Sequence, residues 1–443
     1  MNFSEYIPFY KRNLSLAFPV IISQIGQVTV MIVDNMMVGH VGTNELAAAA
    51  FANNVFMVGM FLGMGITYGL TPIIGQSSGN EIKTASWLKN GFFSHIVIGI
   101  VLLCFLISLY FIMPFLGQTE NVLRLSKSYY LWLCASFLPF LFFYSFKQFF
   151  EGIGNTKIAM YITLSANIIN VFVNYVLIFG KLGMPEMGLT GAGIGTFVSR
   201  LAMPLLFTLV IIKNTQLKHY FLLAKQQSLK IKKIKEVLRV GIPIGLQLVV
   251  ELLTFSLGAI MMGWLGEVPL AAHQVAIGLV AFTYMISLGV ASATTIRVSH
   301  QLGKGDYYSL KKATFASTHL VMFFMFSMAI IFILFNQYLP LIFTNDPEVI
   351  AIASGLIIIA SFFQIFDGLQ VVMLGALRGL SDVKIPMAFA FIAYLFVGIP
   401  TSYILTFEFN VGPRGIWLGF LFGLSFAGVL FFTRFKKLIS AKQ

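Results

Sequence analysis

The feature that most constrains this chain is a series of long apolar stretches separated by short polar loops. A helix that crosses the ~30 Å hydrocarbon core of a bilayer needs about 20 mostly apolar residues. Twelve such stretches lie near residues 15–38, 47–72, 90–113, 129–149, 158–180, 190–212, 238–264, 270–296, 313–335, 349–376, 384–407 and 415–433. They predict twelve transmembrane helices in an all-α polytopic membrane protein, because a helix satisfies its own backbone hydrogen bonds in lipid.

The composition excludes several other classes of protein. Only 10% of the 443 residues are charged, 58% are hydrophobic, and the mean hydropathy is +0.88. Soluble domains carry about 25% charged residues. A cytosolic enzyme, a disordered protein and a nucleic-acid binder are therefore excluded, and the lipid bilayer is the expected surrounding of the chain.

The distribution of basic residues predicts the orientation in the membrane. With both termini inside, the cytoplasmic segments hold 24 of the 29 basic residues. The opposite loops hold four, Arg124, Lys127, Lys181 and Arg414, and Arg200 falls within a span. Cytoplasmic loops of membrane proteins are enriched in Lys and Arg. We therefore expect a multi-pass protein of the cell (inner) membrane with both termini in the cytoplasm.

The two halves of the sequence resemble each other. At a shift of 224 residues, Gly39, Gly65 and Thr71 meet Gly263, Gly289 and Thr295. At a shift of 227, EGIGNTKIAM (151–160) meets RGLSDVKIPM (378–387). Each half holds six spans, so both enter the membrane in the same orientation. This predicts two parallel six-helix repeats, as in transporters that move one half against the other, arranged as V-shaped N- and C-terminal lobes.

The repeat divides the chain into three parts. We expect an N-terminal six-helix lobe at 1–212, a basic cytoplasmic linker at 213–237 and a C-terminal six-helix lobe at 238–443. The linker holds seven lysines, which attract anionic lipid. We expect the protein to act as a monomer.

Three carboxylates lie inside the predicted spans: Asp34, Glu251 and Asp367. Each costs at least ~2.5–3.5 kcal/mol at the membrane centre, so an acid there is a functional hypothesis. The alternative is a polar residue that only orients helices. The duplication does not repeat these acids: Asp34 aligns with Gly258, and Asp367 aligns with Phe140.

Amides and hydroxyls accompany the acids at helical spacing. Gln247 precedes Glu251 by one turn, and Gln364 precedes Asp367 by nearly one. Other polar residues share the faces or the lobe of an acid: Gln27, Asn53, Asn170, Asn174, Thr196 and Gln370. Carboxylate, amide and hydroxyl oxygens suit a hard cation such as sodium. The alternative is that Asn170, Asn174 and Thr196 hydrogen-bond between helices.

Several segments together resemble one transporter family. They are VDNMMVGHVGTNELAAAA, GNTKIAM, GIPIGLQLVVE, RVSHQLGKGD and FQIFDGLQVVMLGALRGLSDVKIP. They resemble the multidrug and toxic compound extrusion (MATE) family, in its NorM-like branch. The resemblance implies an antiporter that exports amphipathic, often cationic, drugs against an inward flow of Na⁺ or H⁺, with no other cofactor.

The resemblance also implies roles for individual residues. In the family, the acid of the first helix governs coupling in the N-terminal lobe, which falls on Asp34, with Asn170, Asn174 and Thr196 around it. The acids of the seventh and tenth helices bind the coupling cation, which falls on Glu251 and Asp367, beside Gln247 and Gln364. Sodium is thus expected at Asp34 or at Glu251 and Asp367. Where NorM-like proteins can place a Tyr before the tenth-helix acid, this chain has Phe363, which removes one oxygen.

Two other functions compete with drug export. A flippase for lipid-linked saccharides would carry a more basic cavity, whereas here three acids face one intramembrane Arg200. Arg200 either pairs with a carbonyl or an acid, or borders a hydrated cavity. An intramembrane enzyme is not expected, because no HExxH, GxSxG or paired catalytic Asp motif is present.

Overall fold

The computed structural model describes residues 3–441, and within that range the chain forms helices and no strand. Its elements are η1 (Phe3–Tyr6), α1 (Ile7–Gly39), α2 (Thr43–Tyr68), α3 (Leu70–Gln76), α4 (Glu81–Ile112), η2 (Met113–Phe115), α5 (Glu120–Gly152), α6 (Thr156–Ile178), α7 (Gly188–Lys213), α8 (Thr215–Gln226), α9 (Ile231–Leu265), α10 (Glu267–Lys304), α11 (Tyr307–Leu334), η3 (Leu339–Ile342), α12 (Pro347–Gly379), α13 (Lys384–Phe391), η4 (Ile392–Gly398), α14 (Ile399–Tyr403), η5 (Ile404–Glu408) and α15 (Pro413–Ser440). Twelve segments are long and apolar enough to cross a membrane, which confirms the predicted all-α polytopic fold.

Most helices are longer than the apolar stretches that predict them. The fourth span is predicted at 129–149, whereas α5 covers Glu120–Gly152. Apolarity marks only the part of a helix that lies in hydrocarbon. Hydrogen-bonded turns continue beyond it through polar residues, as in the first turns of α9, which contain Lys232 and Lys233.

The chain packs as two compact units whose bounds cross the repeat boundary. The first unit is Ile22–Gly245, and the second is Met1–Ile21 together with Leu246–Gln443. The start of α1 thus belongs to the second unit and the start of α9 to the first. The predicted ranges 1–212 and 238–443 describe the sequence repeats. In the packing, the first turns of each repeat belong to the unit formed mainly by the other repeat.

Close backbone contacts hold these exchanged segments in place. In the first unit, a Cβ on Gly69, which lies between α2 and α3, would lie 2.7 Å from the backbone nitrogen of Gly241 on α9. One turn away, a Cβ on Gly65 would overlap the backbone of Gly245. In the second unit, a Cβ on Gly289 of α10 would lie 3.0 Å from the backbone nitrogen of Ile21 on α1. Glycine is needed where backbones approach this closely.

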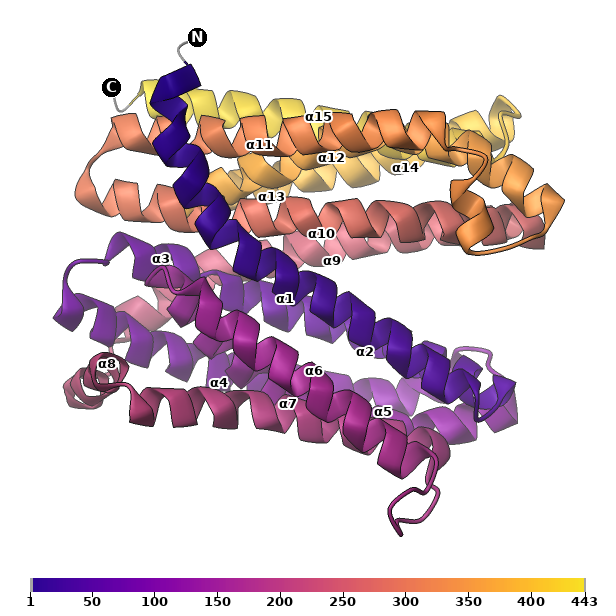
Figure 1. Cartoon of the computed structure of the whole chain (residues 1–443), viewed down its shortest axis with the longest axis horizontal. Coiled ribbons are helices and arrows are strands. Elements are labelled where there is room, and N and C mark those ends of the chain that lie inside the picture. The colour runs from indigo at the N-terminus through magenta and orange to yellow at the C-terminus, as the bar shows by residue number, and fades with distance from the viewer. Residues whose placement is uncertain (1–2, 442–443) are drawn as a thin grey trace. The chain divides into compact units, whose positions relative to one another are not determined.

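The same packing pattern occurs inside each unit. In the first unit, α5 packs against α2, α4 and α7. In the second, α12 packs against α10, α11 and α15, and Figure 1 shows α11, α12 and α15 side by side. Because α5 and α12 are each the fourth span of their half, the fold repeats as the sequence shift predicts.

The basic linker is folded rather than extended. Helix α8 packs against α4 and α7, and Phe221 lies against the rings of Phe92 and Phe149. Lys233 donates to the hydroxyl of Ser86 at 2.7 Å. The linker is therefore an integral part of the first unit.

The eleventh span is the least regular. Two π-helical segments, η4 and η5, flank the short α14. Pro400 lies in α14 and has no N–H for the usual helical hydrogen bond, so the helix widens around it. The widened segment η4 carries Tyr394, which reaches a buried glutamine of α12.

Candidate cation sites

The first unit gathers an acid and two amides from α1 and α6. Asn174 donates through Nδ2 to Oδ1 of Asp34 at 2.7 Å and to Oδ1 of Asn170 at 3.2 Å. Asn170 donates in turn to the hydroxyl of Ser199 on α7 at 3.3 Å. Asn170 and Asn174 are buried, whereas Asp34 is half-buried. These contacts bring the three residues together, and their role in cation coupling stays a prediction.

One oxygen of this network has no partner. Oδ1 of Asn174 is buried and accepts no hydrogen bond from any residue that the structure describes. It lies against Gly195 of α7, where a Cβ would overlap it. A buried polar atom without a partner is costly. The carboxylate of Asp34, Oδ1 of Asn170 and this free oxygen form a set of hard donors for a small cation.

The other polar residues expected near Asp34 make different contacts. Thr196 donates to the carbonyl of Ala192 at 3.0 Å, so this hydrogen bond stays within α7. Asn53 donates to Tyr129 at 3.4 Å. Gln27 accepts from Tyr144 at 3.5 Å. Hydrogen bonds among the described residues therefore join Asn170 and Asn174 to Asp34, but not Thr196, Asn53 or Gln27.

Arg200 of the first unit contacts neither a carbonyl nor an acid through a hydrogen bond. Its Nη1 donates to the hydroxyl of Ser136 at 2.8 Å, and Nη2 lies 4.0 Å from the sulfur of Met60. The guanidinium carbon lies 5.3 Å from the ring centre of Phe56 and 5.0 Å from that of Phe140. A hydroxyl and two aromatic faces therefore surround this cation.

The second unit places two acids in its core. Glu251 of α9 is 9% exposed and Asp367 of α12 is 3% exposed. Tyr284 of α10 donates to Oε1 of Glu251 at 3.1 Å, and Gln370 donates to Oδ1 of Asp367 at 3.4 Å. Tyr394 then donates to Oε1 of Gln370 at 3.1 Å. Both acids are thus held by neutral donors, Glu251 by a residue of the neighbouring α10 and Asp367 by a residue of its own helix α12.

The two predicted glutamines of this unit differ in their contacts. Gln247 accepts through Oε1 from Arg378 at 3.4 Å. Gln364 is completely buried, and neither its nitrogen nor its oxygen has a hydrogen-bond partner among residues 3–441. Its amide is thus a further polar group without a partner beside the acid pair.

Phe363 does not face the acids. Its ring centre lies 5.5 Å from that of Trp417 and 6.3 Å from that of Phe255, in an apolar cluster. Position 363 supplies no oxygen, but the hydroxyl of Tyr284 supplies one beside Glu251. A small cavity of about 10 Å³, enough for one water, is lined by Glu251 and Tyr394.

Sequence reasoning missed the two tyrosines of this site. Tyr284 and Tyr394 lie in the interior of the eighth and eleventh spans. Tyrosine is enriched at membrane interfaces rather than at the bilayer centre. A tyrosine in mid-span was therefore the signal that could have identified both.

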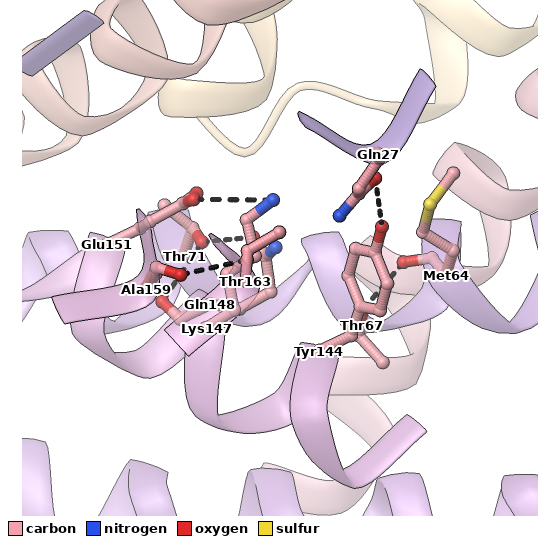
Figure 2. Close-up of polar contacts among 10 residues, drawn as sticks. All are labelled: Gln27, Met64, Thr67, Thr71, Tyr144, Lys147, Gln148, Glu151, Ala159 and Thr163. Carbon is pink, nitrogen blue, oxygen red and sulfur yellow. Dashed lines mark hydrogen bonds and ion pairs between the residues drawn. The ribbon is translucent and has the colours of Figure 1, made fainter. Parts of the chain in front are cut away.

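The first unit also contains a buried ion pair near the C-terminal end of α5. Nζ of Lys147 lies 3.9 Å from Oε1 of Glu151, and the two side chains are 3% and 4% exposed. Figure 2 shows the pair beside the hydroxyl of Thr71, which donates to Gln148 at 2.6 Å. Nζ of Lys147 also lies 5.3 Å from the ring centre of Tyr144. The sequence places both charges at the end of a span, so their burial was not predicted.

None of the three intramembrane acids forms an ion pair within 4.0 Å among the described residues, although Arg200 interacts electrostatically with Asp34 and Arg378 with Glu251. The ion pairs of the described residues join Lys147 to Glu151, His219 to Glu81, Lys312 to Glu5 and Arg434 to Asp382. Within residues 3–441 no group of three or more His, Cys, Asp or Glu could hold a metal ion. The sites are thus single or paired carboxylates with amide and hydroxyl oxygens, which suits exchangeable cations rather than a resident transition metal.

These observations define the class of the protein. It is a polytopic membrane protein of two parallel six-helix repeats, with carboxylates and amides inside the spans. The chain belongs to the MatE family, whose model matches residues 19–176 and 243–404. The two matches begin 224 residues apart, which is the shift of the internal repeat.

Curated relatives match over nearly the whole chain. A probable multidrug resistance protein NorM of Agrobacterium fabrum is 32% identical over 99% of this chain and 96% of its own length. Another, of Halalkalibacterium halodurans, is 32% identical over 97% of this chain and 94% of its own. The multidrug resistance protein MdtK of Yersinia pseudotuberculosis is 28% identical over 98% of this chain and 96% of its own.

Solved structures share the fold. The eukaryotic MATE transporter AtDTX14 superimposes with a TM-score of 0.86 at 21% identity, covering 99% of this chain and 98% of that one. A MATE protein in the straight conformation gives a TM-score of 0.90 at 19% identity, covering 98% and 97%. At these identities the likeness concerns the fold alone.

Proposed function

We propose that this chain is a cation-coupled antiporter, driven by Na⁺ or H⁺, that exports amphipathic and often cationic drugs. The observation that carries the proposal is that Asp34, Glu251 and Asp367 lie inside spans and form no ion pair within 4.0 Å among residues 3–441. A carboxylate in a membrane needs a counter-charge close to it, and a mobile cation can supply that charge at each of these acids. The relatives named as multidrug resistance proteins support the same function.

The Asp34 network supports coupling in the first unit. The carboxylate, Asn170 and Asn174 offer oxygens to an ion, and the same carboxylate attracts an organic cation. A site that is occupied by either the ion or the cargo, but not both, couples their movements. Neutralising a carboxylate also relieves its desolvation penalty, so ion binding can bias which face of the protein is open.

The proposal also covers the location, the oligomeric state and the partners of the protein. The protein resides in the cell (inner) membrane, with both termini in the cytoplasm, and acts as a monomer without a cofactor. Its partners are the lipid bilayer, the coupling ion and small organic compounds. It performs no covalent chemistry on its cargo and is not an enzyme.

Purified protein in proteoliposomes tests the proposal. We expect an imposed Na⁺ or H⁺ gradient to drive ethidium across the membrane in the direction opposite to the ion. Added ethidium should in turn stimulate the flux of the same ion. The two gradients are imposed separately, so the experiment also identifies the coupling ion. Ethidium transport that ignores both gradients, in vesicles with verified insertion, would refute coupled export.

A further inference from the structure

Arg200 is an intramembrane cation that forms no ion pair within 4.0 Å among residues 3–441, although Asp34 interacts with it electrostatically over a longer distance. It lies about 18 Å along α7, in the middle of that helix. No carboxylate of residues 3–441 lies within 4.0 Å of its guanidinium, because the ion pairs are those of Lys147, His219, Lys312 and Arg434. A charge in a membrane span is costly unless it is paired or faces water, so an anion that bonds the guanidinium directly would lower this cost.

The geometry fixes the guanidinium and leaves donors available. The rings of Phe56 and Phe140 lie within 5.3 Å of the guanidinium carbon, and Ser136 accepts one N–H at 2.8 Å. Arginine has five N–H donors in a planar fork that matches a carboxylate. The sulfur of Met60, at 4.0 Å, is only a weak acceptor. The residue as a whole is half-buried, and Ser136 and Met60 engage only two of its five donors.

The fold does not require a cation at this position. Gly195 of α7 and Gly419 of α15 make matching contacts, since a Cβ on either would overlap the side chain at 174 or 402. The same shift of 224 pairs Arg200 with Leu424. The second repeat thus builds the same helix packing with a leucine, so packing alone does not explain the charge.

The surroundings of Arg200 also hold the opposite charge. Tyr129 interacts electrostatically with both Asp34 and Arg200, so one acid and one base flank it in the same unit. A ligand with a cationic amine at one end and a carboxylate at the other would complement both charges. A cargo that is only cationic would leave Arg200 without a partner.

We propose that Arg200 is the specificity-determining residue that binds the carboxylate of zwitterionic amphipathic cargo. The aromatic pair Phe56 and Phe140 orients the guanidinium, and Ser136 holds one of its nitrogens. The aromatic body of the cargo packs beside the two rings. This inference rests on the proposed function as a drug exporter.

The experiment compares two probes that differ only in the carboxylate: norfloxacin, which is a zwitterion, and decarboxylated norfloxacin, which is a cation. Both binding to purified protein and efflux from cells are measured for the wild type, Arg200→Gln and Arg200→Lys. Arg124→Gln is the control, because it removes the same charge from an exposed position of the same unit.

We expect Arg200→Gln to weaken norfloxacin binding by about tenfold or more, because it removes charge-assisted hydrogen bonds. Binding of the decarboxylated probe should stay within about twofold, which also shows that the variant is folded. The norfloxacin affinity of Arg200→Lys should lie between those of the wild type and Arg200→Gln, since lysine keeps the charge without the planar guanidinium. The control should bind both probes as the wild type does.

Equal losses for both probes, or no loss for either, would overturn the assignment. So would a wild type that binds both probes equally well. Selective loss of norfloxacin binding without efflux of any probe would uphold the role of Arg200 and refute the proposed export. The binding and efflux readouts thus separate the failure of one proposal from the failure of the other.

Discussion

The two units share one packing scheme but place their acids at different positions. In the first unit, Asp34 accepts a hydrogen bond from Asn174. The matching positions of the second unit, at shifts of 224 and 228, are Gly258 and Ser402. A Cβ on Gly258 would overlap the ring of Phe420, and Ser402 donates to a main-chain carbonyl at 3.0 Å. The acid–amide pair of the first repeat is therefore replaced in the second by a glycine against an aromatic ring and by a hydroxyl bonded to the main chain.

The reverse holds for the second site. Tyr284 donates to Glu251 near Asp367, all in the second unit. The matching positions of the first unit are Met60, Gln27 and Phe140. Here the first repeat has a thioether, an amide and a ring where the second has a phenol and two carboxylates.

Contacts with the backbone, by contrast, are repeated. Thr71 donates to the carbonyl of Gln148 at 3.1 Å, and its counterpart Thr295 donates to that of Gly375 at 2.8 Å. A substitution that removes such a bond exposes a carbonyl within the membrane, whereas an inward-facing side chain can change without altering the packing. The fold thus depends on contacts that both repeats share, whereas the intramembrane acids and their hydrogen bonds occur in one repeat only.

The largest expected effect comes from Asp34→Asn, which should abolish ion-driven export. Asparagine keeps the shape and the contact with Asn174 but cannot balance a cation. Asp367→Asn and Glu251→Gln should impair export less, because each leaves the other acid of the pair. Gradient-driven ethidium transport in proteoliposomes measures this, with Glu120→Gln, at the exposed first residue of α5, as the control. Full export by Asp34→Asn together with loss in Asp367→Asn would reverse the ranking.

Lys147→Met should destabilise the protein by about 3–5 kcal/mol, because it leaves Glu151 as a buried charge without its ion-pair partner. Glu151→Gln should act in the same direction. The double substitution Lys147→Met with Glu151→Leu should recover most of the loss, since no buried charge remains. Unfolding of the purified protein in detergent measures the change. Additive losses in the double variant would show that the pair is not a coupled unit.

Tyr284→Phe should weaken cation binding in the second unit by about tenfold, because it removes a donor to Glu251 and one oxygen of the site. Phe363→Tyr is the matched control. It adds a hydroxyl among Trp417 and Phe255, so it should lower stability by about 1–3 kcal/mol without changing ion affinity. A gain of ion affinity in Phe363→Tyr would mean that position 363 faces the acids. Sodium titration of purified protein, measured by calorimetry, distinguishes these outcomes.

The smallest expected effect is that of Gly195→Ala. The new Cβ would displace Oδ1 of Asn174 and loosen its bond to Asp34, so the half-saturating concentration of the coupling ion should rise about fivefold. Gly419→Ala makes the matching overlap with Ser402, and should cost about 1–3 kcal/mol of stability without altering the ion dependence. Identical ion dependence in the two variants would argue against an ion site at Asn174.

The sequence alone determined the number and class of the spans, because twenty apolar residues have no other stable form in a bilayer. It also determined the repeat, since the shift of 224 residues is the spacing of the two family matches. The meeting of Asp34, Asn170 and Asn174 could be predicted from residue type and from a family resemblance. The spans and the repeat depend on local composition and on spacing along the chain, whereas the meeting of residues from α1 and α6 was expected through the family resemblance.

Only the tertiary structure decided which helices bring their polar groups together. It joined Tyr284 of α10 to Glu251 of α9, turned Phe363 toward Trp417, and exchanged the first turns of α1 and α9 between the units. It also showed that Arg200 has aromatic faces and a hydroxyl instead of an acid. The physical reason is that helical periodicity specifies which residues share a face, but not which neighbour that face will meet.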